Sequence, residues 1–165
     1  MVIFQSFRGK ITAIDNFWTG SQERTGCYQL MSVVNRDGGT VNFVVRPTTY
    51  FVDHVMVTIG DTVTGFYDAG APTPLIYPPQ FQALVMARET RHQNVKVDFF
   101  NAQLVSRDGA LRLNIGPATR IVLENGQLFT GNPANRNLIV VYGATTRSIP
   151  AQTTPDTVIV MCQGE

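Results

Sequence analysis

The sequence predicts an all-β protein with little helix, built from two related modules in series. Helical periodicity is almost absent, and 14 Gly and 9 Pro residues separate short runs rich in β-branched and aromatic residues. Short segments of the first half return in the second half in the same order, roughly 70 to 75 residues later. The repeated pairs are Arg36-Asp37-Gly38 with Arg107-Asp108-Gly109, Pro47-Thr48-Thr49 with Pro117-Ala118-Thr119, Val63–Tyr67 with Leu138–Tyr142, and Pro78-Pro79-Gln80 with Pro150-Ala151-Gln152. Because a duplicated domain diverges in this way, we expect one module over residues 1–90 and a second over residues 91–165.

The first module is expected to contain five strands. Residues of the turn Arg36-Asp37-Gly38-Gly39 tolerate positive φ, which predicts a tight hairpin between the second and third strands. In the third strand Val41, Phe43 and Val45 share one face, an alternation typical of a half-buried strand. The expected strands are Phe7–Asp15, Tyr28–Asn35, Val41–Arg46, Thr62–Asp68 and Phe81–Arg88.

The second module is expected to repeat this scheme with a shorter start, as if its first two strands were fused. Leu111, Leu113 and Ile115 alternate with polar residues, as in a half-buried strand. The short polar segment 89–94 separates the modules, and a linker this short favours packing between them. The expected strands are Val95–Ser106, Leu111–Ile115, Leu138–Tyr142 and Thr157–Cys162.

Five strands, with a hairpin joining the second and third and a Gly60-Asp61 turn before the fourth, resemble the OB-fold, a small Greek-key barrel. Pro47-Thr48-Thr49, Gly60–Val63, Gly65-Phe66-Tyr67 and Pro78-Pro79-Gln80 look like a short OB-like domain found, often in tandem, in uncharacterised Gram-positive bacterial proteins. The resemblance spans most of each module, more strongly the first. It implies two five-stranded OB-like barrels, and it brings no established activity. Since Asn135-Arg136 stand where the pattern has Gly60-Asp61, the second barrel is expected to be incomplete or to complete itself on its neighbour.

Composition limits the function classes. Charged residues make up only 15% of the chain and the net charge is +1, so bulk electrostatics gives no argument for nucleic acid. The N-terminus lacks the pattern of a signal peptide, and no stretch approaches the roughly 18 apolar residues of a membrane span, so a soluble cytoplasmic protein is expected. Lys10 and Lys96 are the only lysines. The preference for Arg leaves room for specific anion or carbohydrate contacts, or reflects genomic base composition.

No catalytic or metal-binding pattern stands out. His54 and His92 lie in different modules without an acid or nucleophile at a suitable spacing, and the turn carboxylates are explained by turn capping. Cys27 and Cys162 have no metal-ligand spacing and are expected to be free, buried thiols, with a disulfide as the alternative. We therefore expect a protein that is not an enzyme and holds neither a metal nor a cofactor.

Two loops of the first module carry the candidate binding residues. In loop 16–26, the only Trp of the chain, Trp18, is interpreted as a stacking platform for a base or a sugar ring, or as a plug for the barrel end, which is the favoured interpretation. The OB resemblance implies a ligand face on the second and third strands next to this loop. The predicted ligand-binding residues are Trp18, Arg24, Tyr28, Phe43 and Arg46.

Loop 69–79 is stiffened by four prolines and presents Leu75, Ile76 and Tyr77. Its counterpart in the second module, 144–150, has Arg147 near the position of Leu75. These four residues are the predicted partner-binding set. The alternative is structural: Ile76 and Ile149 tuck beneath the barrels while the prolines start the last strand. The Tyr77-Pro78 bond is also a candidate for the cis form.

Three functions are consistent with these observations. The first is a non-enzymatic interaction or scaffold module that holds a protein partner or another copy of itself through the proline-rich loop and apolar barrel surface. The second is oligosaccharide or single-stranded nucleic-acid binding on the OB face, where the near-neutral charge favours the saccharide. The third is a structural component of a coat or shell. No motif of the sequence names an activity.

Overall fold

The computed structural model describes residues 1–162, which form two compact units, Met1–Glu89 and a second unit from Thr90 onward. Both units consist of β-strands, turns and loops. The helical elements of residues 1–162 are two three-residue 3-10 turns, η1 (Gln22–Arg24) and η2 (Val52–His54). The predicted all-β class with little helix is therefore confirmed.

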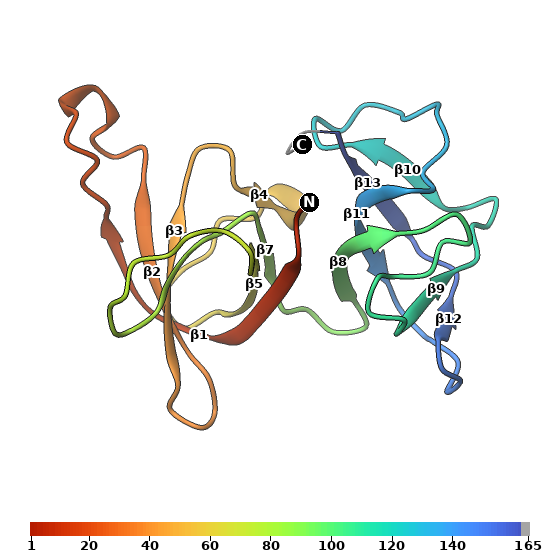
Figure 1. The fold of residues 1–165 in the computed structure, drawn as a ribbon, viewed down its shortest axis with the longest axis horizontal. Coiled ribbons are helices and arrows are strands. Elements are labelled where there is room, and N and C mark those ends of the chain that lie inside the picture. The colour runs from red at the N-terminus through yellow and green to blue at the C-terminus, as the bar shows by residue number, and fades with distance from the viewer. Residues whose placement is uncertain (163–165) are drawn as a thin grey trace. The chain divides into compact units, whose positions relative to one another are not determined.

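Unit 1 contains seven strands that pair in the order β4-β7-β5-β1-β2-β3-β6 (Figure 1). The long first strand, β1, pairs with β5 through its first half and with β2 through its second half, both antiparallel. The strands are β1 (Phe4–Asn16), β2 (Gln29–Val34), β3 (Thr40–Val45), β4 (Tyr50–Phe51), β5 (Thr62–Asp68), β6 (Gln80–Gln82) and β7 (Val85–Arg88).

The segment that contains β6 and β7 joins the two sides of this sheet. β6 runs parallel to β3, and β7 runs antiparallel to β5. Between them, the Ala83 N–H donates to the Val44 carbonyl (3.0 Å) and the Leu84 N–H donates to the Phe66 carbonyl (2.8 Å). The single strand expected over Phe81–Arg88 is therefore divided in two, because the chain changes partner at Ala83 and Leu84. This segment therefore bridges β3 and β5, which are not neighbours in the strand order.

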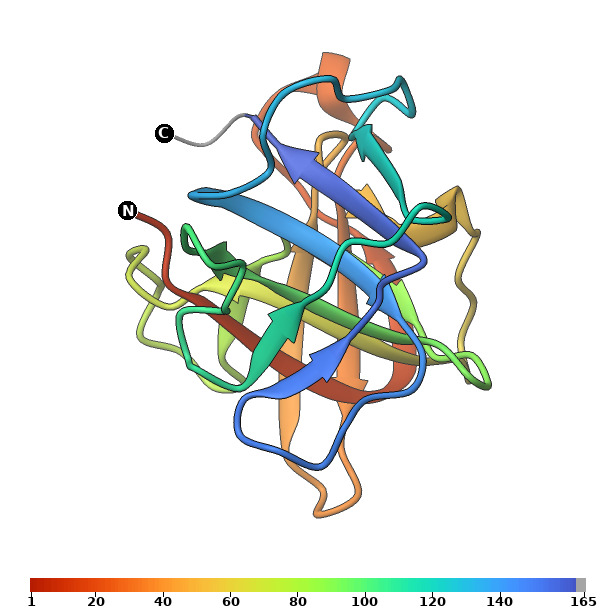
Figure 2. The same ribbon diagram turned by 90° about the vertical axis from the view of Figure 1, so that its right-hand side faces the viewer.

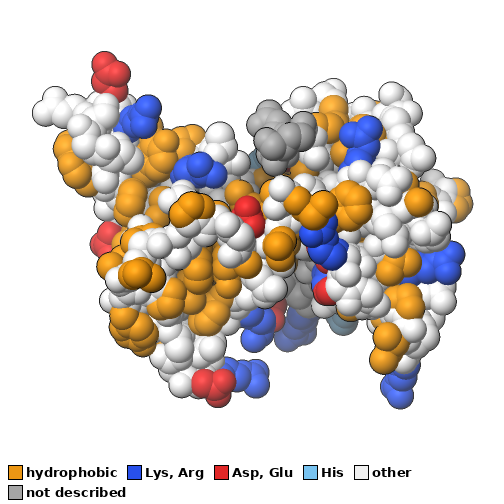
Figure 3. Space-filling view, in the orientation of Figure 1, with side chains coloured by type: hydrophobic (Ala, Val, Ile, Leu, Met, Phe, Trp, Pro, Cys, Tyr) orange, Lys and Arg blue, Asp and Glu red, His pale blue; other side chains and the backbone are white. Residues whose placement is uncertain are grey.

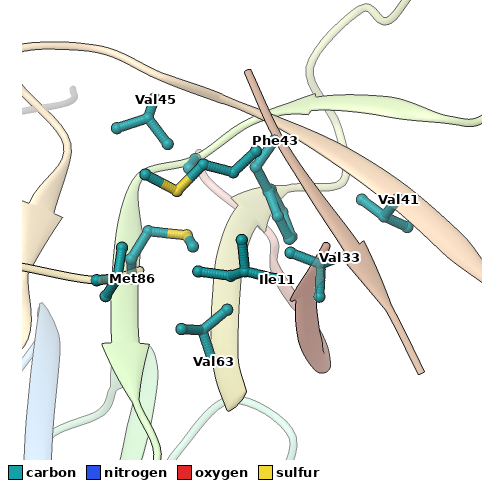
Figure 4. Packing of buried hydrophobic residues seen from close by; sticks show 10 residues of the cluster. Ile11, Val33, Val41, Phe43, Val45, Val63 and Met86 are labelled. Atoms are coloured by element: carbon teal, nitrogen blue, oxygen red, sulfur yellow. The ribbon is translucent and has the colours of Figure 1, made fainter. Parts of the chain in front are cut away.

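The interior of unit 1 is filled by apolar side chains from strands β1, β2, β3, β5 and β7 (Figure 4). Phe43 lies at its centre and is fully buried. A Cβ atom on Gly65 would lie 2.5 Å from the Phe43 ring, so glycine at this position makes room for the ring. The buried members of the cluster are Ile11, Met31, Val33, Val41, Phe43, Val45, Val57, Val63, Ala83 and Met86.

The predicted hairpin between β2 and β3 is present, with Gly38 at φ 83° in its turn. A second turn follows β3. There the Thr49 hydroxyl accepts a hydrogen bond from the Arg46 N–H (2.9 Å) and donates one to the Ala83 carbonyl (2.8 Å). This hydroxyl ties the turn after β3 to the segment that closes the sheet.

Unit 2 contains a four-stranded sheet in the order β10-β13-β11-β8 and a two-stranded sheet of β9 and β12 (Figure 2). Between them, an isolated bridge joins Phe100 of β8 to Ser106, and another joins Val105 to Arg112 of β9. The strands are β8 (Asn94–Phe100), β9 (Leu111–Leu113), β10 (Arg120–Leu123), β11 (Arg136–Tyr142), β12 (Ala151–Thr153) and β13 (Thr157–Met161).

The first strand of unit 2 ends earlier than expected. Val95–Ser106 was predicted as one strand, but β8 ends at Phe100. The Asn101 side-chain oxygen accepts hydrogen bonds from the Gln103 N–H (2.9 Å) and the Val105 N–H (3.1 Å), and Leu104 adopts φ 59°. An Asn side chain that binds backbone groups ahead of it forms a turn, which explains the break.

Four strand pairings have the same direction and order in the two units. The antiparallel pair β1/β5 corresponds to β8/β11 and β5/β7 to β11/β13; the parallel pair β3/β6 corresponds to β9/β12 and β4/β7 to β10/β13. The turn at Thr49 also has a counterpart: the Thr119 hydroxyl accepts from the Gly116 N–H (3.2 Å) and donates to the Pro155 carbonyl (2.7 Å).

Candidate interaction loops and ligand site

The loop 69–79, called the proline loop below, carries exposed apolar side chains on its tip. Leu75 is fully exposed, Tyr77 is 82% exposed and Ile76 is 54% exposed. Figure 3 shows hydrophobic side chains gathered over the part of unit 1 where Figure 1 draws this loop in yellow-green. The expectation that Ile76 tucks beneath the barrel is wrong, because more than half of this residue is in solvent.

Asp68 organises the start of the proline loop. One of its carboxylate oxygens accepts hydrogen bonds from the Ile3 N–H (3.1 Å) and the Gly70 N–H (2.9 Å), and its carbonyl accepts from the Ala71 N–H (3.2 Å). Near the end of the loop, the Tyr77-Pro78 bond, a candidate for the cis form, is cis, and the Pro79 carbonyl accepts from the Asn42 N–H (2.8 Å). Both ends are thus anchored on the sheet, and the apolar tip projects between them.

The loop 143–150 of unit 2, called the second loop below, presents Ile149 and Arg147. Ile149 is 93% exposed, so the expectation that it packs beneath the barrel is also wrong. The reason is local: the loop is closed by its own polar groups. The Thr146 and Ser148 hydroxyls lie 2.7 Å apart, and the Ser148 hydroxyl donates to the Pro150 carbonyl (2.9 Å). Arg147 is exposed, and Ile149-Pro150 is a second cis bond.

The loop 17–28, called the aromatic loop below, projects from the sheet of unit 1 (Figure 1). Its base is closed by a hydrogen bond from the Phe17 N–H to the Tyr28 carbonyl (2.9 Å). Trp18 is 65% exposed, so the expectation that it plugs a barrel end is wrong. Arg24 lies in η1 and is exposed, and its carbonyl accepts from the Cys27 N–H (2.9 Å).

The remaining three predicted ligand residues occupy different environments. Phe43 is fully buried and packs against Tyr67 (ring centroids 6.1 Å apart), so it belongs to the core and cannot stack on a ligand. Tyr28 and Arg46 are half-buried. Tyr28 directly precedes Gln29 and Arg46 directly follows Val45, and Gln29 pairs with Val45. The Arg46 Nε atom is buried and has no hydrogen-bond partner. The structure therefore brings Tyr28 and Arg46 to the same end of the β2/β3 pair and removes Phe43 from the set.

A polar cluster occupies the turn between β8 and β9. Lys96 forms an ion pair with Asp108, and the Ser106 hydroxyl donates to the other Asp108 carboxylate oxygen (2.6 Å). Asp98 is buried and accepts hydrogen bonds from the Phe99 N–H (2.8 Å) and the Asp108 N–H (3.3 Å). Partial burial raises the pKa of Asp108, but the hydrogen bonds from Lys96, Ser106 and the Ala110 N–H outweigh it, so the pKa is lowered overall.

Other titratable groups show simple effects of burial. Desolvation raises the pKa of Tyr67 in β5 and the pKa of Tyr142 in β11, and Glu124 behaves in the same way. His54 and His92 are exposed and lie in different units. Within residues 1–162, no group of three or more His, Cys, Asp or Glu residues is placed to hold a metal ion.

Cys27 and Cys162 are both free and exposed. The expectation of buried thiols is wrong because Cys27 lies in the projecting aromatic loop and Cys162 directly follows β13. Within residues 1–162, no helix is long and apolar enough to cross a membrane.

One groove was not anticipated from the sequence. It has a volume of about 700 Å³, lies in unit 1 beside β1 and the β2/β3 turn, and is lined by charged residues that include Arg8, Lys10 and Arg36. The only sequence signal was the rarity of lysine, which singled out Lys10 without indicating its neighbours.

Comparisons with protein-family models, with curated proteins and with solved structures found no match to this chain.

Proposed function

We propose that the chain is a non-enzymatic interaction module, and that copies of it associate through the apolar tips of the proline loop and the second loop. The observation that carries this proposal is the exposure of Leu75 and Tyr77 on one loop and Ile149 on the other. Burying a large apolar side chain at a loop tip against another surface stabilises the complex, by roughly 1.5–3 kcal/mol for each fully buried side chain.

The proposal includes the architecture that displays these tips. Each unit is interpreted as an OB-like barrel, and the pair as two copies of one module. The bridge that Ala83 and Leu84 form between β3 and β5, the shared strand pairings and the matching hydroxyl bonds of Thr49 and Thr119 support this interpretation. The barrel of unit 2 is interpreted as incomplete, because β8 and β9 lie in separate sheets and the segment between them is joined to each by an isolated bridge rather than by a strand. The similarity to OB-like domains of Gram-positive bacteria stays a prediction.

Charge and loop chemistry favour a second copy of the chain as the partner. The net charge of +1 imposes little repulsion between copies. The tips are apolar rather than charged, so they complement one another without requiring a partner of opposite charge. Since association costs at least about 4 kcal/mol, one tip residue is insufficient, and weak association through several tips is expected.

Substitution of the tip tests the proposal. Leu75→Ser combined with Tyr77→Ser should abolish concentration-dependent association in sedimentation velocity experiments. The matched control is Leu128→Ser, which removes a 72% exposed leucine outside both loops and should leave association unchanged. Equal association of the wild type and the double variant would refute the assignment to the proline loop.

A second function is favoured by the exposure of Trp18 together with the unpartnered Arg46 Nε atom. A sugar ring or a base that stacks on Trp18 would be anchored by an Arg, and the near-neutral charge favours the sugar. Because Trp18 is the only Trp, its fluorescence reports directly on this loop. Titration with oligosaccharides and with single-stranded oligonucleotides should quench the emission in one series, and flat titrations in both would dismiss this function.

A further inference from the structure

The groove in unit 1 is formed where β1 passes from one partner strand to the other. Lys10 is the position of this change, since it pairs with Thr62 of β5 and with Val34 of β2. The turn after β2 forms another part of the groove and contributes Arg36 and Asp37. The groove volume of about 700 Å³ lies within the range of small-molecule sites, roughly 300–1,000 Å³.

The cationic side chains of the groove differ in whether an ion pair with a carboxylate neutralises their charge. Arg8 donates from both Nε and Nη2 to one carboxylate oxygen of Glu89, so this pair is internally neutral. Lys10 and Arg36 take part in neither of the two ion pairs found within residues 1–162. They therefore bring two positive charges to the groove, and the Asp37 carboxylate offsets only one of them.

In the corresponding strands of unit 2, the lysine is neutralised by a carboxylate. Phe99 pairs with Asn137 at the start of β11, as Lys10 pairs with Thr62 at the start of β5. The Arg107 guanidinium lies over the Phe99 ring, 5.5 Å from its centroid, and Lys96 is paired with Asp108. In unit 1 the corresponding strand position carries a lysine instead of an aromatic ring, and that lysine lines the same groove as Arg36.

We propose that this groove binds a saccharide-sized ligand that carries a carboxylate or a phosphate. Lys10 and Arg36 would hold the oxyanion, because a guanidinium binds two oxygens of a carboxylate or phosphate in parallel. The hydroxyls of Thr12 and Thr62, which also line the groove, supply hydrogen bonds for a polar body. Three cationic and two anionic side chains leave the groove a net charge of only +1, which suits a single oxyanion better than a polyanion. This site does not depend on the apolar loops.

Isothermal titration calorimetry with defined probes tests the site. Glucose 6-phosphate and digalacturonate are the phosphate and carboxylate probes, and maltose is the neutral control. At least one acidic probe should bind more tightly than maltose by about tenfold or more, and raising the salt concentration from about 50 to about 500 mM should weaken that binding. The probe that binds identifies the source of the oxyanion. Equal affinity for all three probes, or no binding of either acidic probe, would overturn the proposal.

Three variants locate the binding site. Lys10→Gln combined with Arg36→Gln should weaken binding of the acidic probe at least about tenfold, because both free cations are removed. Arg120→Gln removes an exposed cation of β10, outside the groove, and should leave affinity unchanged. Glu89→Gln removes a groove carboxylate and releases Arg8, so it should tighten binding by about threefold or more.

Amide chemical shifts provide a readout that does not depend on affinity alone. Saturation with the acidic probe should shift the amide signals of residues 8–12 and 34–37, which border the groove. Shifts confined to residues 17–28, with binding of the acidic probe retained in the double variant, would place the ligand at the aromatic loop and refute the groove.

Discussion

The rings of Tyr67 and Phe81 stack face to face, with their centroids 4.0 Å apart and their planes 7° apart. Tyr67 belongs to β5, and Phe81 belongs to β6, which pairs with β3. The stack therefore connects two strands that are not neighbours in the sheet order, close to where the chain crosses from β3 to β5. We interpret it as a clamp that holds the β3 and β5 sides of unit 1 together.

Phe81→Ala should reduce the free energy of unfolding of unit 1 by about 2 kcal/mol, because it removes the stacked ring and part of the apolar packing around it. Phe81→Leu retains most of the volume and should cost about half as much. Urea unfolding followed by Trp18 fluorescence reports on unit 1. An Ala variant as stable as the wild type would contradict the assigned clamp.

Gly65→Ala should destabilise unit 1 by about 1–3 kcal/mol, since the added Cβ atom would lie 2.5 Å from the Phe43 ring in a filled interior. Gly70→Ala is the matched control: its nearest neighbour would be an Asp68 carboxylate oxygen at 3.4 Å, so a change within about 0.5 kcal/mol is expected. Similar free energies of unfolding for the two variants would show that the Phe43 ring can move aside.

Thr49→Val and Thr119→Val should each destabilise their own unit by about 1–3 kcal/mol, because each hydroxyl both accepts and donates a hydrogen bond to the backbone. Thr48→Val, at an exposed position beside Thr49, serves as the control and should be nearly neutral. Hydrogen exchange of amides in β7 and β13 measures the effect in each unit separately. If only one of the two substitutions lowers the stability of its unit, the two hydroxyls do not have equivalent roles.

Unit 2 should lose stability when the pH falls below about 4. The lowered pKa of Asp108 means that its carboxylate stabilises the folded unit above the ordinary value of 3.8, and that this contribution is lost as the pH falls through the lowered folded pKa. The carboxyl carbon shift of Asp108 in an NMR titration measures that pKa. In Asp108→Asn, stability should be lower than in the wild type near neutral pH, and the difference should disappear in acid. A titration at or above 3.8 would refute this role.

Much of the strand pattern could be predicted from the sequence. β5 begins and ends where expected, at Thr62 and Asp68, because turn residues bracket a β-branched and aromatic run. The short strands β4, β10 and β12 were missed, since two to four residues carry too little periodicity to be recognised. Ile115 was expected to continue an alternating strand, but β9 ends at Leu113 and Ile115 is 40% exposed.

Side-chain environments were harder to predict than strands. Alternation in β3 indicates that Val41, Phe43 and Val45 share a face, but it does not say whether that face is the interior or a ligand surface. The position of Gly65 opposite the Phe43 ring decides this, and it depends on pairing between distant segments. The exposure of Ile149 likewise follows from hydrogen bonds within its loop, which composition alone does not reveal.

Light scattering coupled to size exclusion, repeated over a range of loading concentrations, tests the proposed self-association most directly. The account predicts that the weight-average mass of the wild-type chain rises above the monomer value of 18.2 kDa as concentration increases. It also predicts that Leu75→Ser with Tyr77→Ser holds the mass at the monomer value. A wild-type mass that stays at 18.2 kDa up to about 1 mM would contradict association through the loop tips.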